Sequence, residues 1–219
     1  MHRSSRGAVL DHVARRVPEL SGGDCPRVAI DGPDGAGKTT FAAELAAAVR
    51  LLGRPVTSVS LDDFHNVRAV RYRQGRDSPL GFWQDSFNYP RFRSDVLDPF
   101  VPGGSRRYRP AGHDLDTDAV LDPPWRTAAP GTVVIVDGLF LHRDEIGDAW
   151  DLSVFLEVPF ETTARRMAQR DGTNPDPAHP GMRRYVEAQQ IYFAACTPQQ
   201  RADILIDNEH PGEPRIVRG

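Results

Sequence analysis

The sequence has 219 residues, a hydrophobic fraction of 39% and a formal net charge of −3. This length favours one α/β domain with an appended segment over two full domains. The small net charge gives no general reason to expect a nucleic acid or an anionic membrane surface as partner. No apolar run approaches the roughly 20 residues of a membrane span, and the N-terminal region lacks the apolar core of a signal peptide. We therefore expect a soluble, cytoplasmic protein.

The first predicted element is an amphipathic helix, which forms with its linker a segment over residues 1–24. Its apolar residues recur at helical spacing, and the pattern ends in Ser-Gly-Gly-Asp at 21–24. These apolar residues are Val9, Leu10, Val13, Val17 and Leu20. We assign this helix a packing role and no chemistry, and we expect residues 25–219 to form the main domain.

Residues 32–39 match the phosphate-loop pattern G-x-x-x-x-G-K-[ST] at every specified position. A β-branched strand at 27–31 precedes the loop, and an Ala-rich helix over about 38–52 follows it, as the pattern requires. Glycines let the backbone N–H groups turn toward phosphate oxygens, and the helix N-terminus adds positive potential. The sequence therefore predicts that this chain binds a nucleoside triphosphate.

The loop also predicts the cofactors, which are ATP and Mg²⁺. Lys38 is expected to reach the β- and γ-phosphates, and the Thr39 hydroxyl is expected to ligate Mg²⁺. The residues predicted to bind the nucleotide are Gly32, Asp34, Gly35, Ala36, Gly37, Lys38, Thr39 and Thr40.

Beyond the loop, apolar strands alternate with helices. Strands are predicted at about 55–61, 132–137, 151–158 and 202–207, and helices at about 160–171 and 181–195. Near-continuous apolar strands separated by helices indicate a mostly parallel sheet that is buried on both faces. We therefore predict a three-layer α/β/α fold of the P-loop NTPase class. The segment at about 63–130 interrupts the alternation, and its Arg, aromatic and Pro content is typical of an inserted lid or substrate-binding element.

Two acidic residues fall at predicted strand ends. Asp62 follows the strand at 55–61, and Asp137 ends the strand at 132–137. Open parallel sheets bind ligands beyond the carboxyl ends of their strands. A carboxylate there can accept the proton of an attacking hydroxyl or hold the Mg²⁺ that bridges the phosphates. We assign Asp137 to the metal and Asp62 to the base role with a share in metal binding, although strand-end Asp residues also serve as turn residues or helix caps.

These features together resemble the uridine kinase and phosphoribulokinase family over about residues 27–208. The resemblance rests on the phosphate loop, on Asp62-Asp63-Phe64-His65, and on Asp137-Gly138 in place of a Glu-Gly pair. It implies a kinase domain in which Asp62 activates a ribose 5′-hydroxyl, with Phe64 beside the substrate. Uridine or cytidine is then the expected acceptor.

Three further positions carry substrate contacts by the same resemblance. Asn88 stands where the family has an Asp that holds the ribose, and Tyr108 and His113 keep the spacing of a pair that contacts the pyrimidine. The sequence departs from the family at 172–180, where lid arginines are absent, and at Arg184, which replaces a Gln. The acceptor could therefore be another hydroxylated metabolite, and a P-loop ATPase or nucleotide-gated binding module without a small acceptor remains an alternative.

Arg166 and Arg170 are predicted to assist the transfer. They lie four residues apart and therefore share one face of the helix at about 160–171. An arginine at this place can stabilise the charge that spreads over a moving phosphoryl group, and we also place Arg166 among the substrate contacts. The alternative is a solvated arginine face.

The arginines and aromatics of the insertion also allow a different interpretation, a platform for single-stranded nucleic acid. Aspartates dilute this charge and no RNA-binding motif is present, so we favour a small-molecule substrate over a nucleic acid or a membrane. A GTPase switch would require an Asn-Lys-x-Asp motif, which the sequence lacks. The sequence leaves open whether the protein forms a homo-oligomer.

Overall fold

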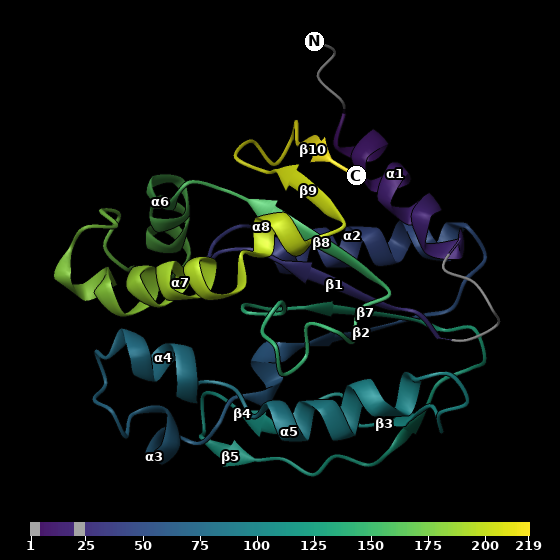
Figure 1. The fold of residues 1–219 in the computed structure, drawn as a ribbon, viewed down its shortest axis with the longest axis horizontal. Coiled ribbons are helices and arrows are strands. Elements are labelled where there is room, and N and C mark those ends of the chain that lie inside the picture. The colour runs from purple at the N-terminus through teal and green to yellow at the C-terminus, as the bar shows by residue number, and fades with distance from the viewer. Residues whose placement is uncertain (1–4, 20–24) are drawn as a thin grey trace.

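A six-stranded sheet lies at the centre of the molecule in the computed structural model, which describes residues 5–19 and 25–219 (Figure 1). The strand order is β10-β9-β8-β1-β7-β2. Five strands run parallel: β1 (Arg27–Asp31), β2 (Val56–Ser60), β7 (Val133–Asp137), β8 (Leu152–Glu157) and β9 (Ile204–Asp207). The mostly parallel sheet predicted from the apolar runs is confirmed. β10 (Arg215–Arg218) pairs antiparallel with β9, and it was not predicted because its residues are mostly exposed and show no apolar run.

One face of the sheet is covered by α2 (Lys38–Leu51), and α1 (Arg6–Glu19) packs on α2. The apolar spacing predicted for the first helix has a clear packing role, since Val9, Val13 and Val17 are buried in the same core as the β1 and β7 side chains of this face. The remaining predicted apolar residue, Leu20, and the linker at 20–24 lie outside the described residues.

The opposite face is covered by α7 (Arg183–Cys196) and by the segment that interrupts the alternation. This segment contains α3 (Arg68–Arg71), α4 (Pro79–Asp85), α5 (Tyr89–Phe92), a π-helical turn (Arg93–Leu97), and the strand pairs β3 (Arg107–Tyr108) with β6 (Arg126–Thr127) and β4 (His113–Asp114) with β5 (Ala119–Val120). Its aromatic side chains Phe64, Phe82, Phe87, Tyr89, Phe92, Phe100 and Tyr108 are buried against the sheet. Because so many of its aromatic side chains are buried against the sheet, the insertion forms the third layer of the core.

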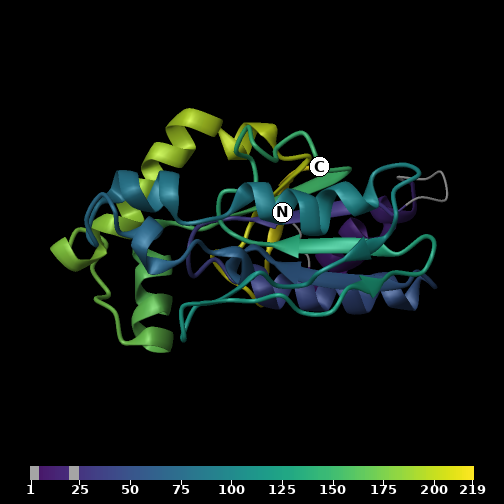
Figure 2. The same cartoon turned by 90° about the horizontal axis from the view of Figure 1, so that it is seen from below.

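Of the two remaining helices, one adjoins the carboxyl end of a parallel strand and the other adjoins the amino end of one. α6 (Phe160–Asp171) follows β8, and α8 (Pro198–Arg201) precedes β9. Figures 1 and 2 both show α6, α7, α3 and α4 gathered at one end of the molecule, beyond the sheet. This end is where an open parallel sheet places its ligands. No helix in the described ranges is long and apolar enough to cross a lipid bilayer.

Candidate active site

The phosphate loop between β1 and α2 has a backbone that only glycine fits at two positions. Gly32, Gly35 and Gly37 have φ angles of 151°, 74° and 88°. A Cβ atom at Gly32 would lie 2.7 Å from the Leu156 carbonyl oxygen, and one at Gly35 would lie 2.8 Å from the Thr163 carbonyl oxygen. The glycines of the motif therefore allow the loop to pack closely against β8 and α6 while it turns.

The rest of the chain holds this loop through polar contacts. Asn208 Nδ2 donates to the Ala36 carbonyl oxygen at 2.8 Å, and the Asp34 amide donates to Gln189 Oε1 at 2.9 Å. Lys38 Nζ donates to the carbonyl oxygens of Gly32 and Pro33 at 3.0 and 2.9 Å, so its ammonium group lies across the loop. Gly37, Thr39 and Thr40 are exposed at the start of α2. The predicted nucleotide-binding residues thus lie together in one loop and helix start, of which Gly37, Thr39 and Thr40 are exposed, whereas Gly32 and Ala36 are buried.

A buried carboxylate at the end of β1 anchors the loop from below, and sequence reasoning missed it. Asp31 Oδ1 accepts from the Gly32 amide at 2.7 Å, and its Oδ2 accepts from the Leu141 amide at 3.1 Å. The Tyr192 hydroxyl also donates to Asp31, and His142 Nδ1 lies 2.8 Å from it. Burial, reinforced by the Asp31 charge, raises the pKa of Tyr192 well above its ordinary value. Leu141, His142 and Tyr192 are far from Asp31 in the chain, so no local motif predicts these contacts.

The predicted metal-side residues lie in direct contact. Thr39 Oγ1 donates to Asp137 Oδ2 at 2.7 Å. Burial raises the pKa of Asp137 above the ordinary value, the Thr39 bond offsets part of this rise, and the charge of Asp62 adds to it. A hydroxyl and a carboxylate are oxygen ligands of the kind Mg²⁺ prefers, so the pair fits this ion. No group of three or more His, Cys, Asp or Glu side chains suited to a metal occurs in the described ranges.

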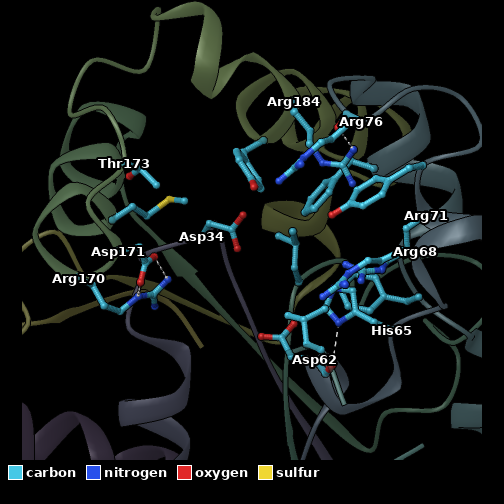
Figure 3. Close-up of a pocket in the computed structure, with 17 residues that line it drawn as sticks. Asp34, Asp62, His65, Arg68, Arg71, Arg76, Arg170, Asp171, Thr173 and Arg184 are labelled. Atoms are coloured by element: carbon cyan, nitrogen blue, oxygen red, sulfur yellow. Dashed lines mark hydrogen bonds and ion pairs between the residues drawn. The ribbon is translucent and has the colours of Figure 1, made fainter. Parts of the chain in front are cut away.

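A cavity of about 620 Å³ opens between the phosphate loop and the end formed by α3, α4, α6 and α7 (Figure 3). In Figure 3 the carboxyl groups of Asp34 and Asp62 point into this space. The lining residues are Asp34, Asp62, His65, Arg68, Arg71, Tyr72, Arg76, Phe82, Phe87, Leu115, Leu139, Met167, Arg170, Asp171, Thr173, Arg184 and Tyr185. The arrangement brings an acidic strand end and the nucleotide loop to one cavity large enough for a small metabolite.

Asp62, which lines this cavity, lies near other carboxyl groups. Its charge contributes to raising the pKa of Asp34, Asp63 and Asp137, for each of which burial is the larger cause. Beside it, His65 Nδ1 donates to the Asp62 carbonyl oxygen at 2.7 Å. Burial lowers the pKa of His65, so the ring is neutral at pH 7 and its Nε2 is an acceptor. His65 is thus a second polar group available to a bound hydroxyl.

The two helical arginines that were predicted to share one role have different contacts in the structure. Arg170 lines the cavity and pairs with Asp171 at 2.7 Å, a bond that is the main cause of its raised pKa. Arg166 instead donates to the carbonyl oxygens of Gly35, Asn208 and Glu209 at 3.1, 3.1 and 2.8 Å. With these three bonds Arg166 braces the phosphate loop, and Arg170 is the member of the pair that faces the cavity.

Four residues expected beside the substrate lie behind the cavity wall. Phe64 and Tyr108 are buried in the core, and the Tyr108 hydroxyl is bonded to Thr57 Oγ1 at 2.7 Å. The Asn88 side chain caps α5 by accepting from the Arg91 amide at 3.1 Å. His113 is buried, with Nε2 3.1 Å from Asp118. None of the four lines the described cavity, so this geometry gives no support to direct substrate contacts from them.

Four arginines of the lining belong to the insertion and to α7, namely Arg68, Arg71, Arg76 and Arg184. A partial signal for them is present in the sequence, because the insertion is rich in arginine and Arg184 departs from the family pattern. It could not show that they meet, since Arg184 and Arg76 lie 108 positions apart and the Arg184 guanidinium donates to the Arg76 carbonyl oxygen.

No protein-family model matches the sequence, and no curated protein sequence matches it significantly. Solved structures do share its fold. A possible uridine kinase from Bacillus stearothermophilus is 20% identical with a TM-score of 0.71, and the match covers 90% of this chain and 96% of that one. A candidate fructose transport system kinase from Silicibacter sp. is 23% identical with a TM-score of 0.66, over 83% and 94% of the two chains.

A D-glycerate 3-kinase from Cryptococcus neoformans is a third similar structure, 13% identical with a TM-score of 0.59 over 96% of this chain and 98% of that one. At such identities the likeness establishes the fold. The predicted fold is confirmed, and this chain has the three-layer P-loop α/β/α fold of solved small-molecule kinases.

Proposed function

We propose that this protein is an ATP-dependent kinase that transfers the γ-phosphoryl group to a hydroxyl of a small molecule. The observation that carries the proposal is the shared cavity, which has the phosphate loop on one side and the Asp62 carboxylate pointing into it. Phosphoryl transfer needs a positioned nucleotide, a positioned hydroxyl and a group that accepts the hydroxyl proton. The similar solved structures are named as kinases, which supports the same reaction class for this chain.

Each residue near the cavity has a distinct role in this proposal. The backbone amides of residues 32–39 and the Lys38 ammonium bind the phosphates, and Thr39 with Asp137 would hold Mg²⁺. When bound, the ion neutralises charge on the β- and γ-phosphates. Asp62 accepts the proton of the attacking hydroxyl, and Arg170, which enters the cavity beside Asp171, balances charge on the phosphoryl group in transit.

The resemblance names uridine and cytidine as the first acceptors to test. Its strongest substrate residue, Asp62, lines the cavity, which is consistent with the proposed base role. The pair expected at the pyrimidine is not in the cavity wall, because Tyr108 is buried in the core and His113 contacts Asp118 behind it. The proposal therefore commits to a hydroxylated small molecule, with the pyrimidine nucleosides as one class among those tested.

The competing proposal is a P-loop ATPase without a small acceptor. The cavity of about 620 Å³ beside Asp62 favours an acceptor, since an ATPase needs room only for water. The test is ADP release from MgATP by the purified protein, alone and with nucleosides, sugars, polyols and hydroxy acids. We expect little turnover alone and strong stimulation by one acceptor class. Steady turnover that no acceptor changes would refute the kinase proposal.

A further inference from the structure

Arginines on the acceptor side of the cavity surround a single aromatic ring. The guanidinium carbons of Arg71, Arg76 and Arg184 lie 5.2, 5.8 and 5.1 Å from the centre of the Tyr72 ring. Arg68 lines the cavity next to them, and Figure 3 shows these side chains across the cavity from Asp34, with Asp62 beside His65 and Arg68. We call Arg68, Arg71, Arg76 and Arg184 the arginine wall.

The charge of the arginine wall is poorly balanced. Within the described ranges its ion pair is the one between Arg71 and Asp118, at 3.3 Å. Arg184 is 8% exposed and bonds only the Arg76 carbonyl oxygen, while Asp77 acts on it from beyond ion-pair distance. Arg71 is 6% exposed and its buried Nε has no hydrogen-bond partner. Buried guanidinium groups normally have carboxylate partners and satisfied N–H groups, so this site lacks anions.

Stacking on aromatic rings does not replace that missing charge, as another buried arginine of this protein shows. Arg143 is 9% exposed and lies 4.0 Å from the Trp83 ring centre and 5.0 Å from that of Tyr89. It nevertheless pairs with Glu145 through both Nε and Nη2. Arg184 has the same kind of aromatic surroundings, Tyr72 and Phe82, and no carboxylate in ion-pair contact. The difference is that Arg184 borders the cavity and Arg143 does not.

The cavity therefore has carboxylates and guanidinium groups in different parts of its lining. Asp34 of the phosphate loop lies across the cavity from the arginine wall, and Asp62 lies beside His65 and Arg68, at the edge of the wall. An acceptor that places a hydroxyl at Asp62 and an oxyanion at Arg71 and Arg184 would match both kinds of group. A neutral acceptor would leave buried guanidinium groups without a counter-charge, which is costly.

We propose that the acceptor is an anionic hydroxylated metabolite, whose phosphate monoester or carboxylate group binds the arginine wall while its free hydroxyl lies at Asp62. The guanidinium fork suits either oxyanion, because both accept paired N–H donors. This inference rests on the proposed kinase function, since it identifies the substrate class of the same cavity. The phosphoryl group passes from ATP to the acceptor hydroxyl oxygen, the hydroxyl proton passes to Asp62, and ADP leaves.

The first test measures anion binding without turnover. The melting temperature of the full chain, saturated with magnesium and a non-hydrolysable ATP analogue that fills the phosphate loop, is followed while inorganic phosphate or acetate is added. We expect one of these anions to stabilise the wild type and the variant Arg183→Gln. Arg183 is the matched control, because it adjoins Arg184 on α7 but is exposed and pairs with Glu187 at 2.8 Å.

In Arg184→Gln the apparent affinity for that anion should fall on the order of 10- to 100-fold, the range expected for losing a charged hydrogen-bonding group. Stabilisation by the ATP analogue itself should persist and will show that the variant is folded. Phosphate stabilisation identifies a phosphate monoester, and acetate stabilisation a carboxylate. Equal anion binding by wild type and Arg184→Gln, or none by the wild type, would overturn the inference while leaving the kinase proposal standing.

The second test uses matched acceptors that differ by one anionic group, such as sugars and sugar phosphates, polyols and hydroxy acids, or nucleosides and their 3′-monophosphates. The anionic member of a pair should give the higher kcat/KM. Arg184→Gln should raise its KM, and Arg184→Lys should recover part of the loss by restoring the charge. A neutral acceptor preferred equally by wild type and Arg184→Gln would overturn the inference. Absence of any acceptor-dependent turnover would instead refute the kinase function.

Discussion

The phosphate loop and the arginine wall face each other across one cavity, yet they are built in opposite ways. The loop uses eight consecutive residues, and its recognition groups are backbone amides and one lysine, Lys38. The wall uses side chains from α3, from the segment after it and from α7, and two of its members, Arg76 and Arg184, are 108 positions apart. Local sequence therefore specifies the nucleotide side, whereas tertiary packing specifies the acceptor side. Under the proposed function, the nucleotide side would determine the reaction class and the acceptor side would determine which hydroxyl reacts.

The largest effect is expected on the loop side, from Lys38→Met. This change removes the ammonium group that lies across Gly32 and Pro33 and leaves their carbonyl oxygens without that donor. Losing one preorganised charge contact costs about 10²–10³ in rate, and weaker ATP binding adds to it, so kcat/KM for ATP should fall on the order of 10⁴-fold. Steady-state kinetics and ATP titration would measure both parts. Unchanged ATP affinity with normal turnover would contradict the role of the loop.

Asp62→Asn should act at the boundary between the two sides. The amide keeps the size of the side chain but cannot accept the hydroxyl proton, so kcat should fall by about 10²–10⁴-fold. ATP affinity should change little, because the loop residues that bind the phosphates do not depend on Asp62. Binding titration beside steady-state rates separates the two quantities. Turnover close to that of the wild type would remove Asp62 from the base role.

Asp137→Asn should raise the Mg²⁺ concentration needed for half-maximal turnover on the order of 10- to 100-fold. It should also raise the melting temperature of the protein without nucleotide. The pKa of Asp137 is raised, mainly by burial, so the folded state holds its proton more tightly than the unfolded chain. Ionisation of Asp137 therefore subtracts stability as the pH rises through and above the ordinary value of 3.8.

The same raised pKa predicts how magnesium use depends on pH. Mg²⁺ needs the ionised carboxylate, so its apparent affinity should fall as the pH is lowered toward the raised pKa, and Asp137→Asn should lose this component. A variant with wild-type magnesium dependence at every pH would place the metal elsewhere.

The smallest effect is expected from Tyr192→Phe, which tests how firmly the loop is anchored. It removes the hydroxyl that donates to buried Asp31 and accepts from the His142 amide at 3.0 Å. Losing a bond to a charged group should cost about 2 kcal/mol of unfolding free energy. Tyr108→Phe is the matched control, since its hydroxyl bonds the neutral Thr57, and it should cost about 1 kcal/mol. Urea unfolding would compare them, and a larger loss in Tyr108→Phe would contradict the anchoring role.

Much of the fold could be predicted from the sequence because its signals are local. The apolar strands at 132–137 and 151–158 coincide closely with β7 and β8, and the helix at 160–171 coincides with α6. The insertion was the difficult part. Its aromatic residues lack helical or strand periodicity because they pack as short turns and two-residue strands. The sequence therefore predicted an inserted lid or substrate-binding element but not that much of this insertion is also a layer of the core.

In the candidate site, too, the contacts set by local motifs could be predicted, and those set by tertiary packing could not. The contact between Thr39 and Asp137 follows from strand order and motif, since both lie at carboxyl ends of adjacent parallel strands or just after them. The anchoring by Asp31 and the placement of Arg184 beside Tyr72 depend on packing between distant segments. Spacing within one motif carries no information about such contacts. For the same reason, Tyr108 and His113 can keep a family spacing although neither side chain lines the cavity.

The most direct test of the central claim is product analysis by mass spectrometry alongside ADP release. If the cavity holds an acceptor whose hydroxyl is activated by Asp62, one phosphoryl group should appear on the acceptor for each ADP released. ADP formed while every acceptor stays unmodified would mean that water is the nucleophile, and it would contradict the account.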